Sequence, residues 1–175
     1  MKRLGIVLIT LVALACRQDA SLAGKGPAGG AREAAVAGAF YPSDPRALRL
    51  AVEGLLQDAM PAKVDRPVAL VAPHAGYVYS GQIAADAWSQ AKGRDYDIVV
   101  LLGTNHTAPG FAGVALSPDR GFRTPLGVAE IDREAGEALA RADADVVVDA
   151  RPHLAEHSVE VQVPFAQVLF PRARI

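Results

Sequence analysis

The chain has 175 residues, of which 51% are hydrophobic and 21% are charged, a balance typical of one globular domain and unlike that of a disordered chain. Its 18 basic and 19 acidic residues nearly cancel, and no stretch concentrates Lys and Arg as a nucleic-acid-binding face would require. The composition therefore argues against a nucleic-acid partner.

The first 16 residues have the pattern of an export signal. Lys2 and Arg3 give a positive start, residues 4–15 form an apolar run that is too short to span a bilayer, and Ala13-Leu14-Ala15 resembles a cleavage site. Cys16 is the only cysteine and follows directly, as in a bacterial lipobox. We therefore predict an exported protein that is anchored to the membrane through a lipid on Cys16. The alternative is an ordinary signal peptide and a periplasmic or secreted protein.

A flexible linker is predicted at 17–33, because this stretch is rich in Gly, Ala and Ser. The folded domain is predicted over 34–175. Its first helix is expected directly after Ser43 and Asp44, which can cap the helix, with Pro45 in the first turn. Apolar residues at helical spacing form one face of this helix: Leu48, Val52, Leu55 and Leu56.

Apolar runs and helical patterns alternate along the rest of the domain. Strands are predicted at 68–72, 97–102, 113–116 and 146–149, helices at about 81–91 and 132–141, and extended or turn structure at 122–132. The stretch 158–169 is interpreted as a helix, although Pro164 interrupts it and alternating valines also fit a strand. Residues 170–175 resemble the start of another buried strand. This order predicts an α/β fold with three layers around a mostly parallel sheet.

Two histidines follow the carboxyl ends of predicted buried strands, where open α/β sheets bind their ligands. His74 comes after the strand at 68–72, and His106 comes after the strand at 97–102. Gly76 and Gly103 lie beside them and permit unusual backbone angles or close approach. Because neutral imidazole is a common metal ligand, these positions predict a shared metal site. The alternative is that each imidazole only bonds to the backbone of its own loop.

Two further histidines lie four residues apart in His153-Leu154-Ala155-Glu156-His157. On a helix, this pattern would resemble a zinc protease motif with Glu156 as general base, but no apolar helix pattern supports it. We favour an acid–base cluster of Glu156, His157 and Glu160, in which a carboxylate orients His157 and raises its basicity. A plain polar turn is the alternative.

Four other polar residues have two interpretations each. Tyr77 and Tyr79 either line the same cleft or cover the sheet, and we favour packing. Arg123 and Thr124 either bind an anion or pair at the surface, and we favour pairing.

Five motifs occur in order along the domain: Ala39-Phe40-Tyr41-Pro42, Ala72-Pro73-His74-Ala75-Gly76-Tyr77-Val78-Tyr79-Ser80-Gly81, Gly103-Thr104-Asn105-His106, Phe122-Arg123-Thr124-Pro125-Leu126-Gly127, and Glu156-His157-Ser158-Val159-Glu160-Val161-Gln162-Val163-Pro164-Phe165. This series resembles the Memo family, known in prokaryotes as AmmeMemoRadiSam system protein B.

The Memo family is similar in turn to the class III extradiol dioxygenases, which open catechol rings with non-haem iron. The resemblance implies their α/β architecture, His74 and His106 as metal ligands, and His157 in the acid–base position, with Glu160 as a further catalytic residue. Memo proteins bring another ligand, usually a cysteine, from a C-terminal segment that does not follow Ile175 here. The chain is therefore expected to be either an N-terminal portion of such a protein or a form that has lost part of the site.

We predict a metal-binding protein with a dioxygenase-like site for Fe(II), although copper and zinc accept the same imidazole ligands. Its ligand would be a small molecule or a peptide. The competing interpretations are a non-catalytic protein that binds a peptide or a metal, and an inactive fragment. The sequence makes no prediction about the oligomeric state.

Overall fold

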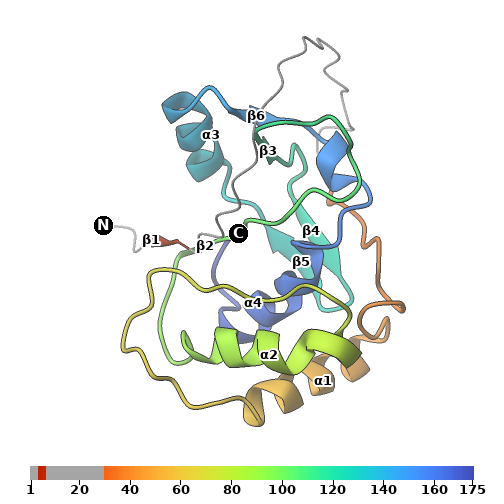
Figure 1. The fold of residues 1–175 in the computed structure, drawn as a ribbon, viewed down its shortest axis with the longest axis vertical. Coiled ribbons are helices and arrows are strands. Elements are labelled where there is room, and N and C mark those ends of the chain that lie inside the picture. The colour runs from red at the N-terminus through yellow and green to blue at the C-terminus, as the bar shows by residue number, and fades with distance from the viewer. Residues whose placement is uncertain (1–3, 7–29) are drawn as a thin grey trace.

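The computed structural model describes residues 4–6 and 30–175 (Figure 1), so Cys16, the predicted cleavage site and most of the predicted linker lie outside the described residues. The α/β class is confirmed. The elements are, in chain order, β1 (Leu4–Ile6), α1 (Pro45–Gln57), α2 (Tyr77–Ser89), β2 (Ile98–Val100), β3 (Val114–Leu116), β4 (Gly121–Thr124), β5 (Gly127–Glu130), α3 (Arg133–Ala142), β6 (Val146–Val148), two single 3₁₀ turns η1 (Arg151–His153) and η2 (Glu160–Gln162), and α4 (Val163–Leu169).

The first predicted helix is confirmed as α1. The Asp44 carboxylate accepts a hydrogen bond of 2.8 Å from the backbone N–H of Ala47, and the helix buries Leu48, Val52 and Leu56. The second helix, α2, begins four residues before its predicted start at Gly81. A glycine weakens the prediction of a helix, but here a Cβ on Gly81 would lie 3.0 Å from the Leu55 side chain. The glycine therefore allows α2 to pack closely on α1.

The strands form three two-stranded ladders in place of one continuous sheet. β3 and β6 pair in parallel, β4 and β5 form an antiparallel hairpin, and β2 pairs in parallel with β1. Residues 170–175 form no strand, but Arg174 makes a single parallel bridge with Ile98 of β2. The predicted strands at 97–102, 113–116 and 146–149 are therefore present, in shorter form.

The predicted strand at 68–72 is wrong. This segment has no strand structure, and the side chains of Val68 and Val71 are 79% and 74% exposed. A strand has two edges, and those of β2 are occupied by β1 on one side and by Arg174 on the other. With β1 in place, no edge of β2 is free for residues 68–72, so an apolar run of the right length stays unpaired; β1 itself lies in the predicted export segment.

The main hydrophobic core lies among α1, α2 and α4, which gather at one end of the molecule, whereas α3, β3 and β6 lie at the other (Figure 1). Trp88 of α2 stacks on Phe165 of α4 with a ring-centroid distance of 6.2 Å. Pro164 does not interrupt α4 but lies in its first turn, where the missing N–H has no cost. The helical interpretation of this stretch is therefore correct. Within residues 4–6 and 30–175, no helix has the length and hydrophobicity needed to cross a membrane.

The predicted boundary between linker and domain at residue 34 is wrong by at least two residues. Arg32 is buried, and its backbone N–H donates a hydrogen bond of 2.8 Å to the carbonyl oxygen of Gly121. Its guanidinium forms an ion pair with Glu160, which is 128 residues away in the sequence. Local composition contains no sign of so distant a partner.

Candidate metal centre

Three imidazoles meet at one place although they come from three separate segments. His74 lies in the loop before α2, His106 in the loop after β2, and His157 in the turn before η2. The ring centroids are 5.2 Å apart for His74 and His106, 4.6 Å for His106 and His157, and 5.9 Å for His74 and His157. One nitrogen of each ring lies within 4.8 Å of the others. The structure thus brings together the two histidines predicted from strand ends and adds His157 to them.

The Glu156 carboxylate holds His106 at two points. One oxygen lies 2.9 Å from Nδ1 of the His106 ring, and the other accepts a hydrogen bond of 2.5 Å from the backbone N–H of the same residue. Because a carboxylate accepts hydrogen bonds, the His106 proton is placed on Nδ1, and the lone pair of Nε2 is left free to bind a metal. A carboxylate that fixes a histidine tautomer in this way is a common feature of metal sites.

Glu156 is buried and charged. Burial alone would raise the pKa of this carboxyl group, but hydrogen bonds outweigh it: the backbone N–H and ring of His106 and the backbone N–H groups of Ser158 and His157 lower the pKa to about 2. Glu156 is therefore ionised at neutral pH and can bond to His106 and His157 at the same time.

His157 is fixed mainly through its backbone, whose N–H donates a hydrogen bond of 2.8 Å to Glu156 Oε1. Its ring Nδ1 lies 3.4 Å from the same oxygen, and its ring packs against Phe40 at a centroid distance of 4.9 Å. The expectation that a carboxylate orients His157 is met more loosely than for His106, which takes the shorter of the two ring contacts to Glu156.

His74 is the more buried of the two predicted ligands. Burial lowers the pKa of His74, and the positive charges that His106 and His157 can carry lower it further, against a weaker opposite effect from Glu156. The neutral imidazole, which is the form that binds metals, is therefore favoured at neutral pH. The carbonyl oxygen of Pro73, directly before His74, accepts a hydrogen bond of 2.9 Å from Gln162 Nε2.

The two glycines beside the imidazoles differ. Neither has a positive φ, so the expectation of unusual backbone angles is wrong for both. Close approach is confirmed at Gly103, where an added Cβ would collide with Ser158 Oγ and lie 2.8 Å from Val159 Cγ2. At Gly76 the nearest atoms would be Phe40 Cα and the Phe40 carbonyl oxygen at 3.4 Å, an ordinary contact.

Glu160 does not lie among the three imidazoles. Its fully buried carboxylate accepts hydrogen bonds from the Tyr41 hydroxyl at 2.6 Å and from the backbone N–H groups of Ala35 and Val36 at 2.8 and 3.0 Å, in addition to its ion pair with Arg32. Burial and the Glu160 carboxylate raise the pKa of Tyr41, so the hydroxyl keeps its proton and remains a donor. Glu160 thus ties residues 32–41 to the segment that carries His157.

His153 is also separate from the cluster. Its ring is largely buried, with Nε2 3.2 Å from the Ala115 carbonyl oxygen and the ring edge against Phe122. Burial lowers the pKa of His153. Because η1 ends at His153 and the following residues do not continue as a helix, His153 and His157 share no helix face. The zinc protease arrangement is therefore absent from the described part of the chain.

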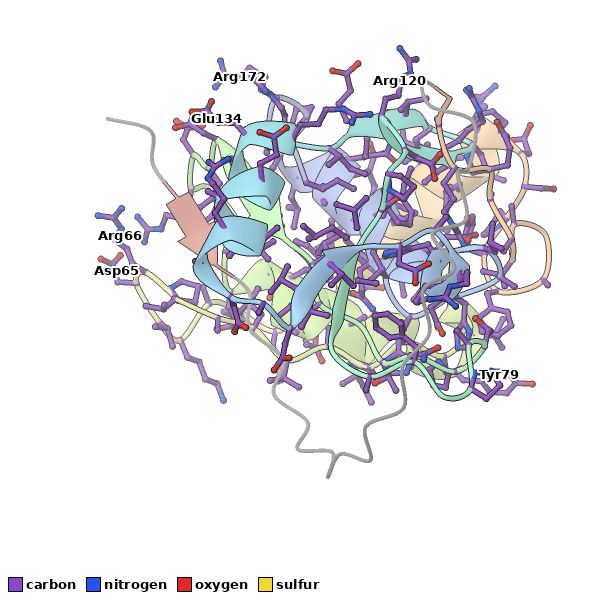
Figure 2. All side chains as sticks on the ribbon, turned by 90° about the horizontal axis from the view of Figure 1, so that it is seen from above. Asp65, Arg66, Tyr79, Arg120, Glu134 and Arg172 are labelled. Carbon is purple, nitrogen blue, oxygen red and sulfur yellow. The ribbon has the colours of Figure 1, made fainter. Side chains whose placement is uncertain are left out.

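Of the four residues with two interpretations, Tyr77 packs and Arg123 pairs at the surface as we favoured, whereas Tyr79 does not pack and Thr124 pairs in a buried position. Tyr77 packs in the core and donates a hydrogen bond of 2.8 Å from its hydroxyl to the Val161 carbonyl, whereas Tyr79 projects from the surface (Figure 2). Arg123 pairs with Glu33 at 2.8 Å, and the Thr124 hydroxyl donates to Gln167 at 2.6 Å. Tyr79 thus neither packs on the sheet nor lies in a cleft.

Side chains that support the imidazoles were not found by sequence reasoning. The Ser158 hydroxyl donates a hydrogen bond of 2.8 Å to the Thr104 carbonyl, two residues before His106, and Gln162 bonds to Pro73 before His74. Both lie two residues from Glu156 or Glu160, which were predicted as site residues. Polar residues in an otherwise apolar stretch were the available signal, but their partners lie 54 and 89 residues away.

In comparison with known proteins, residues 32–175 match the model of a protein family described as Memo-like protein. A MEMO1 family protein of Methanothermobacter thermautotrophicus is 41% identical over 152 residues, which cover 82% of this chain and 54% of the relative. A MEMO1 family protein of Methanopyrus kandleri is 43% identical over 148 residues, covering 79% and 52%. One from Aeropyrum pernix is 40% identical over 149 residues, covering 79% and 53%. The chain spans about half the length of these curated relatives.

Proposed function

Because this chain belongs to the Memo-like protein family, we propose that it is a metalloprotein in which His74, His106 and His157 hold one divalent ion. The observation that carries the proposal is the convergence of the three imidazoles, with one nitrogen of each ring within 4.8 Å of the others. A set of imidazoles suits iron, copper and zinc, and we propose Fe(II) as the resident ion.

The donors fit such an ion in charge as well as in position. The lowered pKa of His74 favours its neutral form, and the bond from Glu156 to His106 Nδ1 leaves Nε2 free. The nearby carboxylate also compensates part of the positive charge of the ion. His106 and His157 are partly exposed, so a ligand can reach the cluster from solvent.

We propose a dioxygenase-like reaction as the activity. A bound ion with open positions would supply a place where a small molecule and dioxygen are held together and activated. The residues of the chain would then position the substrate and move protons. In this variant of the proposal His157 carries the proton in place of acting as third ligand, with Glu156 Oε1, 3.4 Å from its Nδ1, stabilising the protonated ring.

Metal analysis of the full chain, purified without oxygen, tests the site. We expect about one metal ion per chain, and loss of metal in His74→Ala and His106→Ala proteins that keep a cooperative thermal transition. His153→Ala is the matched control, because His153 lies outside the cluster and should leave metal content unchanged. A folded parent that stays empty after iron, copper and zinc are each offered would contradict the proposal.

The His157→Ala protein separates the two roles of His157. Loss of metal identifies a third ligand, whereas full metal content with loss of oxygen uptake on a catechol identifies a proton carrier. The competing function is non-catalytic binding of a metal or a peptide. Metal at one ion per chain without oxygen uptake on any catechol tested would favour that function over the enzyme.

A further inference from the structure

We propose that Gln162 is a positioning residue for His74: it fixes the peptide plane from which the His74 backbone begins. The inference rests on the proposed function in one respect only, namely that His74 is a metal ligand. Gln162 has no contact with the imidazoles that would make it a ligand or a catalytic residue. Its two hydrogen bonds instead join the core to the loop that carries His74.

The Gln162 side chain is buried, and both ends of its amide are used. Oε1 accepts a hydrogen bond of 2.7 Å from Trp88 Nε1, and Nε2 donates one of 2.9 Å to the Pro73 carbonyl. The orientation of the amide is fixed by chemistry, since an indole N–H can only donate and a carbonyl oxygen can only accept. Turning the amide over would oppose donor to donor and acceptor to acceptor, so a single orientation is allowed.

The bond to Pro73 acts directly on His74. The Pro73 carbonyl and the His74 N–H belong to one planar peptide group, so a bond that fixes this carbonyl also fixes the direction in which His74 leaves it. The proline ring restricts φ on the preceding side. Gln162 therefore removes the main remaining rotation of the chain just before the ligand.

The other end of the same loop bonds to Val161, the residue of η2 directly before Gln162. The Tyr77 hydroxyl donates a hydrogen bond of 2.8 Å to the Val161 carbonyl, and the Tyr77 N–H donates one of 2.7 Å to the Phe40 carbonyl. The loop from Pro73 to Tyr77 is thus held at both ends by residues 161 and 162. Glu156 and Ser158 hold the His106 loop, and His157 lies in the same segment. The positions of all three imidazoles therefore depend on one stretch, residues 156–162.

The test compares Gln162→Met with Trp88→Phe in the full-length protein. Methionine has a similar size and loses both hydrogen bonds, whereas Trp88→Phe loses only the indole bond and leaves the bond to Pro73 in place. Co²⁺ is the probe, because its affinity and its visible absorption both report on ligand geometry. Thermal unfolding and hydrogen–deuterium exchange of residues 70–77 are measured on the metal-free proteins.

We expect Gln162→Met to weaken Co²⁺ binding about 10- to 100-fold, to change the visible spectrum, and to speed exchange of the His74 and Ala75 amides. Trp88→Phe is expected to lower the melting temperature and to keep the parent's Co²⁺ affinity and spectrum. Equal loss of affinity in the two variants would assign Gln162 to general core stability and overturn the proposal, as would parent-like binding by Gln162→Met.

Two further outcomes are decisive. If the parent itself binds no Co²⁺, the proposed function fails, and the exchange data decide the positioning role alone: unchanged exchange at His74 in Gln162→Met overturns it, and faster exchange there supports it. If Gln162→Met does not fold, Gln162→Glu replaces it, because a carboxylate still accepts from Trp88 but cannot donate to Pro73. Failure of both variants to unfold cooperatively would make Gln162 a core residue and overturn the proposal.

Discussion

The loops of His74 and His106 hold their imidazoles in different ways. The His106 loop is fixed at the side chain itself, through the 2.9 Å contact between Nδ1 and Glu156, and also at its backbone through Ser158 and Glu156. The His74 loop is fixed on either side of His74, at the Pro73 carbonyl through Gln162 and at Tyr77 through its N–H and hydroxyl. Among residues 4–6 and 30–175, the His74 ring makes no hydrogen bond, and its ring contacts are with His106 and His157.

This difference suggests a division of tasks between the two loops. A ring held by a carboxylate has one tautomer and one orientation before any ligand arrives. A ring held only by its backbone can still rotate about its side-chain bonds, so its final orientation would be set by the ligand. We infer that His106 is the preorganised part of the site and His74 the adaptable part, and both depend on residues 156–162.

The largest expected effect comes from Glu160→Ala, which breaks the support that both loops share. The substitution leaves the buried Arg32 guanidinium and the Tyr41 hydroxyl without their carboxylate, and losing one partner of a buried ion pair costs about 3 to 5 kcal/mol. Urea unfolding of the metal-free protein measures this loss of unfolding free energy.

Glu53→Ala is the matched control for Glu160→Ala. Glu53 forms an exposed pair with Arg49 at 3.7 Å in α1, and such pairs contribute less than about 1 kcal/mol. If Glu160→Ala were no more destabilising than Glu53→Ala, the network around Arg32 would not stabilise the segment that carries His157.

The role of Glu160 also shows where prediction from sequence stops. Glu160 was predicted, together with Glu156 and His157, to belong to a polar cluster in an apolar stretch. Its partner Arg32 lies in a composition typical of a linker, and nothing periodic connects two residues that are 128 positions apart. Sequence reasoning could therefore identify the segment but not which of its carboxylates contacts an imidazole.

Prediction of the fold has the same limit, since local sequence does not show distant partners. Local signals predicted α1 and α3 correctly, because a capping Asp and an apolar face are contained in the helix itself. The run at 68–72 has equally good local signals and forms no strand, since pairing depends on whether β2 has a free edge. The convergence of His74 and His106 was nevertheless expected, because it required only that both loops lie near the same end of the fold.

The second prediction concerns the contact that distinguishes the two loops. Glu156→Gln keeps the shape of the side chain but removes the charge and replaces one acceptor by a donor facing His106 or His157. Loss of such a supporting carboxylate weakens metal binding about 10- to 100-fold. Competition for Co²⁺ against a chelator of known affinity measures the change, with Glu53→Gln as the matched exposed control.

The location of the change in amide exchange caused by Glu156→Gln tests the difference between the His106 and His74 loops. Deuterium exchange should become faster at the amides of Thr104 to Thr107 and remain unchanged at those of His74 to Tyr77, because Glu156 bonds to the first loop and to residues 157 and 158 but not to the second loop. Equally faster deuterium exchange in both loops would show that the two loops are stabilised together. The division of tasks between His106 and His74 would then be wrong.

The smallest expected effect comes from adding one methyl group to each loop in turn. Gly103→Ala forces a Cβ into Ser158 Oγ and to 2.8 Å from Val159, and overpacking of this kind costs about 1 to 3 kcal/mol. Gly76→Ala brings a Cβ to 3.4 Å from Phe40 at a backbone conformation that alanine adopts freely, so its effect should stay within about 1 kcal/mol.

Thermal and urea unfolding measure the difference in stability between the two alanine proteins. Their Co²⁺ affinities show whether the same difference affects metal binding. Gly103→Ala should also weaken Co²⁺ binding, because the methyl group pushes the His106 loop away from the segment that holds it, whereas Gly76→Ala should bind as the parent does. The reverse order would mean that the His74 loop has the tighter packing. Since only one of the two glycines is in forced contact, the pair tests whether close packing or backbone hydrogen bonding sets the position of a histidine loop in this protein.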